Sequence, residues 1–431
     1  MRGAATAANP PIPDGTVLTA LPGHRTMSDS AFPIRLAARM SQLPDYLMEK
    51  INKLRQFKRR EGTDLIDMSM GNPRDPTPQP IVEKLAEAVQ DPRNHRYSVA
   101  TGIHNLRNEL AKYYAARYDV ALDPESQVIA TIGSKEGFSH LCLALIGEGD
   151  RAVVPAPAYP IHSYSVLLAG GESVPLPVQD DAQFLRELVA LCEDAARRPK
   201  VLFLNYPHNP TGHCVELAFF DEIVQVARRF QAIVVHDFAY GRITFDGFKH
   251  PSFLQAKGAL QVGCEFGTMS KAYNMAGWRV GYAVGNREVI GALNRIKGYY
   301  DYGIFQAVQI ASIIALRHGE EEIARQVATY QKRRDLVAGG LRGAGWDVAP
   351  PRGGMFLWVK IPEPFAKDGS YAFAMRLMEE ANVVVSPGIG FGPLGEGWVR
   401  MAIVENEKRL QQAMRSIRQH FSVPGSTART A

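Results

Sequence analysis

The chain has 431 residues, more than one typical domain, so two or three compact units are expected. Apolar residues make up 46% and charged residues 22%, which excludes a mainly disordered, collagenous or coiled-coil chain. The net charge of +5 comes with no long basic block, which argues against a nucleic-acid partner. No apolar run approaches the roughly 20 residues that span a bilayer, so no membrane partner is expected.

The two ends of the chain differ in composition from the rest. Residues 1–30 are rich in Ala, Pro, Gly, Thr and Ser and lack the apolar stretch of a signal peptide, so we predict a disordered tail, with Met27 as a second candidate start. A short polar tail is predicted at 423–431. The cysteines are too few for a disulfide framework and match no short metal-ligand spacing. We therefore expect no metal site. We also expect a cytoplasmic protein in which the cysteines are reduced thiols, namely Cys142, Cys192, Cys214 and Cys264.

From residue 127 onward, short apolar runs alternate with helical patterns. This alternation predicts an α/β fold with a mostly parallel sheet and helices on both faces. The predicted strands lie at 127–131, 152–154, 172–177, 201–205 and 232–237, and the clearest helices at 135–145 and 216–230.

After about residue 320 the pattern changes to that of a smaller α+β unit. A long charged helix is predicted at 321–339, followed by two short apolar segments. These two segments are 346–348 and 356–360. Beyond them the pattern predicts a helix at 370–381, strands near 383–386 and 398–402, and a last helix at 405–421.

Ligands of such sheets bind at the carboxyl ends of the strands, so candidate chemistry is sought there. The strand at 127–131 leads into the small-residue turn 133–137, which opens a helix and offers backbone N–H groups to an anion. The alternative is an ordinary helix capped by Ser134. The strand at 201–205 leads to Asn209, held between His208 and Pro210, whose amide can donate to a ligand oxygen; the alternative is a plain Pro/Gly turn.

Two further places carry ionisable groups. Asp237 closes a buried apolar strand, where a carboxylate is costly unless it is paired, and Tyr240 follows it; the alternative is a cap for the next turn. Lys271 stands among small and apolar residues, eight positions before Arg279. An isolated lysine is usually a solvated surface residue, but desolvation lowers the pKa of its amine and makes it a nucleophile.

Together these places supply what pyridoxal 5′-phosphate (PLP) requires. The cofactor needs a lysine for its imine, an acid for the pyridine nitrogen, donors for the ring oxygen and an anion cradle for the phosphate. The joint pattern is far more specific than any single part, and it predicts a PLP enzyme.

Over about residues 35–422 the sequence resembles the class I/II aminotransferase family of fold-type I PLP enzymes. The matching motifs are, in order, Gly71-Asn72-Pro73, Tyr97, Gly133-Ser134-Lys135, Tyr159, Asn209-Pro210-Thr211-Gly212, Asp237 with Tyr240, Ser270-Lys271 with Arg279, and Arg400. The residues of these motifs are most similar to those of bacterial glutamate–pyruvate (alanine) aminotransferases, with LL-diaminopimelate aminotransferases as near relatives. The resemblance implies a large PLP-binding domain at 76–329 and a small domain formed by 31–75 and 330–422.

The resemblance also implies roles for the catalytic residues. Lys271 is expected to form the imine to the cofactor and then to carry the proton between substrate and cofactor carbons. Asp237 is expected to pair with the protonated pyridine nitrogen, while Asn209 and Tyr240 bind the ring oxygen.

Phosphate and substrate contacts follow from the same resemblance. The expected phosphate ligands are Gly133, Ser134, Lys135, Thr268, Arg279 and, as an additional contact, Ser270. Tyr159 is expected to stack on the ring, and Tyr97 to reach the neighbouring subunit's cofactor in a homodimer with shared active sites. Arg400 would grip the substrate carboxylate as a two-pronged fork, beside Asn209 and the closely approaching backbone of Gly71. Each of these three residues has an alternative interpretation when it is taken singly. Arg400 could form a surface ion pair, Tyr97 could be an exposed aromatic residue, and Tyr159 could serve packing alone.

One stretch departs from the aspartate aminotransferases of the family. Those enzymes carry an arginine, from the partner subunit, for the distal substrate carboxylate, whereas residues 298–306 contain none here. An aromatic pocket with little charge suits small or apolar amino acids, so the expected reaction is L-alanine + 2-oxoglutarate to pyruvate + L-glutamate. The alternatives are an LL-diaminopimelate or other aminotransferase, a PLP lyase or oxidase on the same fold, and a regulator with an aminotransferase-like domain, whose N-terminal winged helix has no counterpart here.

Overall fold

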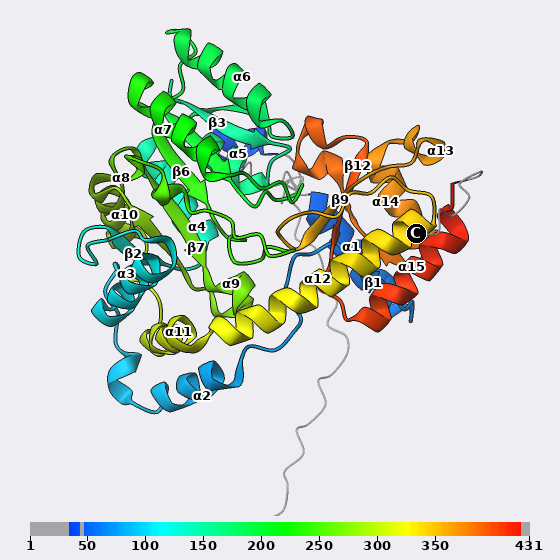
Figure 1. Cartoon of the computed structure of the whole chain (residues 1–431), viewed down its shortest axis with the longest axis horizontal. Helices are drawn as coiled ribbons and strands as arrows, with labels where there is room; N and C mark the ends of the chain where they lie inside the picture. The colour runs from blue at the N-terminus through cyan, green and yellow to red at the C-terminus, as the bar shows by residue number, and fades with distance from the viewer. Residues whose placement is uncertain (1–33, 44–46, 424–431) are drawn as a thin grey trace, which may run out of the picture.

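The computed structural model describes residues 34–43 and 47–423. The predicted tail 1–30 and the predicted tail beyond residue 423 lie outside the described residues. The larger part of the described chain is a seven-stranded sheet between two layers of helices (Figure 1). The strand order is β2-β8-β7-β6-β5-β3-β4, with β2 Val128–Thr131, β3 Arg151–Ala156, β4 Glu172–Pro177, β5 Val201–Asn205, β6 Ile233–Asp237, β7 Gly263–Thr268 and β8 Gly281–Gly285.

The predicted mostly parallel sheet is confirmed, with β8 running against both of its neighbours, β2 and β7. The strands β7 and β8 were not predicted, because glycines and the charged Glu265 interrupt their apolar runs. The glycines allow close contact between strands: a Cβ on Gly263 would meet the backbone of Val234, and one on Gly267 would meet the ring of Tyr282. The glycines of these two strands are therefore explained by the close approach of neighbouring strands, and not by an apolar pattern in the sequence.

Alternate residues of each buried strand face different helices. In β5, Leu202 and Leu204 belong to the apolar cluster under α3, α6 and α7, whereas Val201 and Phe203 belong to the cluster under α4, α5 and α10. The helices of these layers are α3 His104–Tyr118, α4 Ser134–Leu145, α5 Pro160–Leu168, α6 Asp181–Glu193, α7 Leu217–Phe230 and α10 Arg287–Tyr300. The sheet is therefore buried on both faces, as expected for a parallel arrangement.

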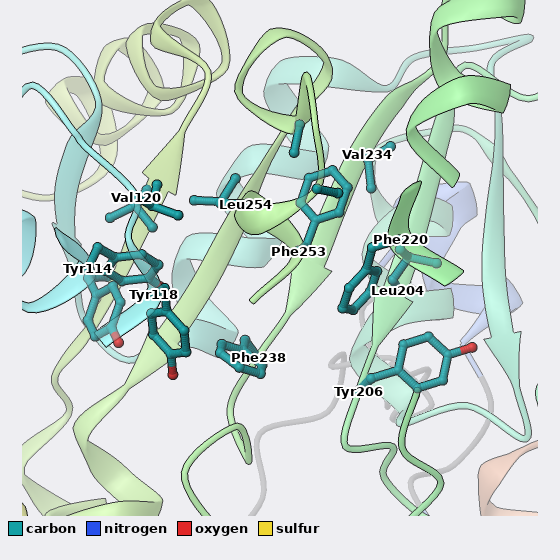
Figure 2. Close-up of a cluster of buried hydrophobic side chains, with 14 of the residues drawn as sticks. Tyr114, Tyr118, Val120, Leu204, Tyr206, Phe220, Val234, Phe238, Phe253 and Leu254 are labelled. Atoms are coloured by element: carbon teal, nitrogen blue, oxygen red, sulfur yellow. The ribbon is translucent and has the colours of Figure 1, made fainter. Parts of the chain in front are cut away.

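One part of this core supports the carboxyl ends of β5 and β6. Figure 2 shows Leu204, Phe220 and Val234 together on the face covered by α7, with Phe253 beside them. The rings of Phe220 and Phe253 meet edge to face at 5.8 Å between centroids. Each fully buried side chain of this size contributes about 1.5–3 kcal/mol. The strand ends at Asn205 and Asp237 thus rest on a tightly packed layer.

A smaller assembly lies beside the main sheet (Figure 1). It contains an antiparallel sheet of order β11-β12-β9 and a parallel pair, β1 with β10. Its elements are α1 Leu47–Arg60, β1 Ile66–Asp67, β9 Phe356–Lys360, α13 Glu363–Ala366, α14 Gly369–Glu380, β10 Val383–Val384, β11 Ser386–Pro387, β12 Trp398–Ala402 and α15 Glu407–Phe421. The pairing of β1 with β10 brings together the two segments assigned by prediction to the small domain.

Helix α12, Glu320–Gly343, runs along both parts of the molecule (Figure 1). Its residue Ile323 packs in the core of the main sheet, whereas Val337 and Leu341 pack in the core of the smaller assembly. The predicted boundary between 329 and 330 therefore falls inside a continuous helix. The domain boundaries themselves stay predictions.

The remaining short elements connect these layers. They are α2 Gln79–Ala88, α8 Ala259–Val262, α9 Met269–Ala272, α11 Gln306–His318 and the 3-10 turns Ala38–Gln42, Pro92–His95, Phe253–Gln255, Ala276–Trp278, Gly388–Phe391 and Pro393–Gly395. All four cysteines are buried free thiols. Among the described helices, none combines the length and apolar character that a bilayer crossing requires.

Candidate active site

A cavity of about 580 Å³ lies where the carboxyl ends of the main sheet meet the smaller assembly. Most of the residues predicted for the site line it, although they come from distant parts of the sequence. The predicted residues on its wall are Gly71, Ser134, Lys135, Tyr159, Asn209, Asp237, Tyr240, Thr268, Ser270, Lys271, Arg279 and Arg400. Gly133 and Tyr97, which were also predicted, are not among them.

Lys271 lies in the short helix α9, directly after the end of β7. The side chain of Thr268 caps this helix by accepting from Ser270 N at 3.1 Å. The Lys271 Nζ donates to the carbonyl oxygen of Gly71 at 2.6 Å. Burial, followed by the positive charges of Arg400 and Arg279, lowers the pKa of the Lys271 amine to about 8, against a smaller opposing effect of Asp237. About a tenth of these amines are therefore neutral and nucleophilic at pH 7, far more than at the ordinary pKa.

Asp237 ends β6, and its carboxylate is held from two sides. His162 Nε2 lies 3.1 Å from Oδ2, and Ala239 N donates to Oδ1 at 3.2 Å. The backbone of Asp237 is fixed as well, because Asn205 Nδ2 donates to its carbonyl oxygen at 2.8 Å. His162, fully buried in α5, was missed by the sequence analysis, since no local motif connects it with a residue 75 positions away.

Asn209 is fixed by contacts from both parts of the molecule. Its backbone N donates to Asn205 Oδ1 at 2.9 Å, and its side-chain Oδ1 accepts from Arg400 at 2.9 Å. Because the amide oxygen faces Arg400, the amide NH₂ is the group that can donate to a ligand. Nearby, burial raises the pKa of Tyr240 above its ordinary value, so that its hydroxyl stays protonated.

The turn between β2 and α4 has the features of an anion cradle. Gly133 has a φ of +76°, and a Cβ there would collide with the guanidinium of Arg279. Glu136 stabilises the backbone of the turn, because its Oε2 accepts a hydrogen bond from Ile132 N at 2.8 Å. Burial and the charge of Arg279 lower the pKa of Lys135. Two cations thus stand together at a helix N-terminus, an arrangement that an anion stabilises.

These features provide a test of whether the residues suit PLP. Like-charged Lys135 and Arg279 repel each other until an anion lies between them, which suits a phosphate group. A lysine of lowered pKa and a fixed carboxylate stand on the same cavity wall. The residues therefore fit PLP: Ser134, Lys135, Thr268, Ser270 and Arg279 would hold the phosphate, Asp237 the pyridine nitrogen and Lys271 the aldehyde carbon.

Arg400 is buried in β12, in the part of the cavity lining that the smaller assembly provides. One guanidinium nitrogen donates to Asn209, and another donates to the carbonyl oxygen of Ser69 at 2.7 Å and lies 3.3 Å from Ser386 Oγ. The guanidinium carbon lies 4.1 Å from the ring centroid of Phe356 and 4.7 Å from that of Phe391. The fork is therefore held between two aromatic faces before substrate arrives.

The supporting residues around Arg400 were also missed by the sequence analysis. Ser386 and Phe391 lie in the stretch 386–392, where no local pattern indicates a role for either side chain. Ser69 acts through its backbone carbonyl, and no side-chain pattern indicates that contact.

Tyr97 stands apart from the cavity, with 90% of its surface exposed. Its ring packs against Tyr302 at 5.4 Å between centroids. Tyr299, Tyr300 and Tyr302 are also exposed, all within the arginine-free stretch 298–306. The expected contact of Tyr97 with a neighbouring subunit's cofactor stays a prediction.

Comparisons with known proteins agree with this geometry. The family model "Aminotransferase class I and II" matches residues 63–417. The chain is 47% identical to the glutamate-pyruvate aminotransferase AlaC of Escherichia coli K12, covering 91% of this chain and 95% of that protein. It is 43% identical to the LL-diaminopimelate aminotransferase of Moorella thermoacetica, covering 89% and 97%. Substrate-bound BacF from Bacillus subtilis superposes with a TM-score of 0.84 at 33% identity, covering 90% and 98%. The chain thus belongs to the class I and II aminotransferases, a PLP-dependent family of fold-type I enzymes.

Proposed function

We propose that this aminotransferase moves the amino group of L-alanine to 2-oxoglutarate, forming pyruvate and L-glutamate. The observation that carries the proposal is the placement of Lys271. Its amine, with a pKa of about 8, lies on one cavity wall with the carboxylate of Asp237 and the fixed guanidinium of Arg400. A proton carrier, an anchor for a nitrogen cation and an anchor for a carboxylate are what transfer of an α-amino group requires.

PLP, when bound, supplies an aldehyde that takes up the amino group and a ring that withdraws electrons from the substrate Cα. The chain supplies the positioning and the proton. Lys271 Nζ would accept the proton from Cα and deliver it to the carbon that was the cofactor's aldehyde, because its lowered pKa permits both protonation states near neutral pH. Asp237 would face the ring nitrogen, and His162 and Ala239 hold its carboxylate in place.

A small substrate agrees with the wall that faces Arg400. Aromatic side chains form it, including Phe356 and Phe391, and the stretch 298–306 has no arginine that would demand an acidic side chain. The similarity to a glutamate-pyruvate aminotransferase supports alanine, whereas the nearly equal similarity to an LL-diaminopimelate aminotransferase supports the second candidate. The proposal of alanine is therefore tested directly against LL-diaminopimelate.

We also propose that the enzyme is a homodimer with shared active sites. The exposed rings of Tyr97, Tyr299 and Tyr302 support this, because such large aromatic groups are rarely left together in water. The cytoplasmic location indicated by the cysteines stays a prediction. Sedimentation of wild-type protein and of Tyr97→Ser would test the dimer.

The test of function uses single amino acids without any oxo acid. Purified PLP-loaded protein is mixed with L-alanine, L-glutamate or LL-diaminopimelate, and the visible absorbance of the cofactor is followed with identification of the oxo acid formed. Conversion by both alanine and glutamate supports the proposal. Conversion by LL-diaminopimelate but not by alanine would show that the substrate is LL-diaminopimelate and not alanine. Steady release of ammonia without an amino acceptor would indicate a lyase or oxidase.

The lowered pKa of Lys271 has a consequence for the cofactor-free protein. Because only the neutral amine reacts, acetylation of Lys271 by acetic anhydride should rise with pH through a midpoint of about 8, well below its ordinary 10.5. Mass spectrometry of the Lys271 peptide measures it, with exposed lysine peptides as internal references. Since the Arg400 charge contributes to the shift, Arg400→Leu should move the midpoint to higher pH. A midpoint equal to that of the exposed lysines would contradict the prediction.

Replacing Arg400 by lysine should weaken substrate binding more than it slows the chemistry. Lysine keeps the charge but loses the planar fork that donates to Asn209 and Ser69 and packs between the two rings. We expect KM for both amino and oxo acids to rise about 100-fold, corresponding to roughly 2–3 kcal/mol. Steady-state kinetics measure this, with Arg409→Lys, which alters the exposed pair with Asp64, as a matched control. An unchanged KM would remove Arg400 from the carboxylate site.

A further inference from the structure

The cavity carries more positive charge than the proposed cofactor and one carboxylate account for. Its wall has seven basic side chains and two acidic ones, Asp67 and Asp237; the basic ones are Arg55, Arg59, Arg74, Lys135, Lys271, Arg279 and Arg400. Lys135 and Arg279 serve the phosphate, and Arg400 serves the substrate α-carboxylate under the proposed function. The three arginines that remain come from α1 and from the loop after Gly71.

Two of these three arginines are already neutralised by carboxylates. Arg55 pairs with Asp67, and Arg74 lies 3.5 Å from Asp67 and 2.5 Å from Glu405. Both carboxylates are buried. Within this group three guanidinium groups face two carboxylates, so one positive charge is left over.

The remaining charge belongs to Arg59. It stands four residues after Arg55 on α1, which places the two side chains on the same face of the helix. Arg59 is exposed, and among the described residues it has no ion pair within 4 Å. Asp64, whose pKa it helps to lower, is instead held by both nitrogens of Arg409 at 2.7 Å. Of these three arginines, Arg59 is thus the one available to an incoming anion.

The arginine group and Arg400 flank one short segment of backbone. Asp67 Oδ1 accepts from Ser69 Oγ at 2.6 Å, and the Ser69 carbonyl accepts from Arg400 at 2.7 Å. Two residues of extended chain span roughly 6–7 Å. Arg55 and Arg400 thus bind groups that lie two residues apart in the chain, and Arg59, one turn of α1 beyond Arg55, lines the same cavity as Arg400.

We infer that Arg59 determines specificity by receiving the distal carboxylate of a dicarboxylic substrate, glutamate or 2-oxoglutarate, while Arg400 holds its α-carboxylate. This inference rests on the proposed function. It gives the acidic substrate a binding group from the same chain, in place of the arginine missing from 298–306. The distal end of LL-diaminopimelate carries an ammonium beside its carboxylate and has no net charge, so the excess charge favours the simple diacid.

The test compares Arg59→Gln with Arg60→Gln, which removes a neighbouring exposed arginine that does not line the cavity. The first readout is the ratio of kcat/KM for L-glutamate to that for L-alanine in the reaction with a single amino acid. The second is the Kd of glutarate for the PLP-loaded enzyme by calorimetry. In Arg59→Gln we expect the ratio to fall and the Kd to rise about tenfold, with partial recovery in Arg59→Lys and changes below twofold in Arg60→Gln.

The outcomes separate this inference from the proposed function. If wild type converts alanine and glutamate but Arg59→Gln leaves both the ratio and the glutarate Kd within twofold, the inference is overturned and the function stands. If alanine is not converted but Arg59→Gln weakens glutarate binding selectively, the function fails and the carboxylate site stands. An equal loss in Arg60→Gln would show a diffuse charge effect and would also overturn the assignment to Arg59.

Discussion

The Lys271→Ala variant is expected to lose transamination, with turnover of alanine and 2-oxoglutarate falling about 10⁴-fold. The loss follows because no other amine on the described cavity wall lies beside both Asp237 and the carbonyl of Gly71. Binding of PLP should survive in part, since the phosphate contacts of Lys135 and Arg279 remain. Coupled assay of pyruvate measures the turnover, and equilibrium dialysis with the cofactor absorbance measures the binding.

Lys135→Ala is the matched control, because it removes another lysine from the same cavity. It should weaken PLP affinity by weakening the anion cradle while changing turnover of the fully loaded enzyme far less. The two variants therefore separate proton transfer from cofactor retention. Near-normal turnover in Lys271→Ala, measured with protein free of wild-type enzyme, would overturn the assignment of Lys271.

Asp237→Ala carries the second large expected effect. The other carboxylate of the described wall, Asp67, is paired with Arg55, so without Asp237 the positive charge of a protonated ring nitrogen loses its partner and kcat should fall about 10³-fold. Asp237→Glu keeps the charge and should lose less, and His162→Leu, which removes the contact at 3.1 Å but keeps the carboxylate, should lose least. The measurement is kcat at saturating alanine for all three variants, with PLP affinity determined in parallel.

The order of the three losses is the critical result. A fold or cofactor-binding defect would affect PLP affinity together with kcat, whereas loss of the charge opposite the ring affects kcat at full occupancy. If Asp237→Ala retained more than a tenth of wild-type kcat, the carboxylate would not perform the proposed role.

Much of the fold could be predicted because its elements have local causes. Apolar runs such as 201–205 are buried on both faces of the sheet, and β4, β5 and β12 have the predicted bounds. The strands β7 and β8 could not be predicted, because their glycines are explained only by the backbone of neighbouring strands. The buried Glu265 in β7 is satisfied by Tyr114, Ser252 and His236, which lie far from it in sequence.

By itself the sequence determined the family and the PLP chemistry, because residues such as Asp237 and Lys271 stand within short motifs at strand ends. The tertiary structure decided how those groups are tuned. It lowers the pKa of Lys271 through burial and the charges of Arg400 and Arg279, places His162 against Asp237, and leaves Arg59 as an unmatched charge on the cavity wall. Such effects depend on distances between residues that packing alone brings together, and Asn209 and Arg400, 191 positions apart, meet at 2.9 Å for that reason.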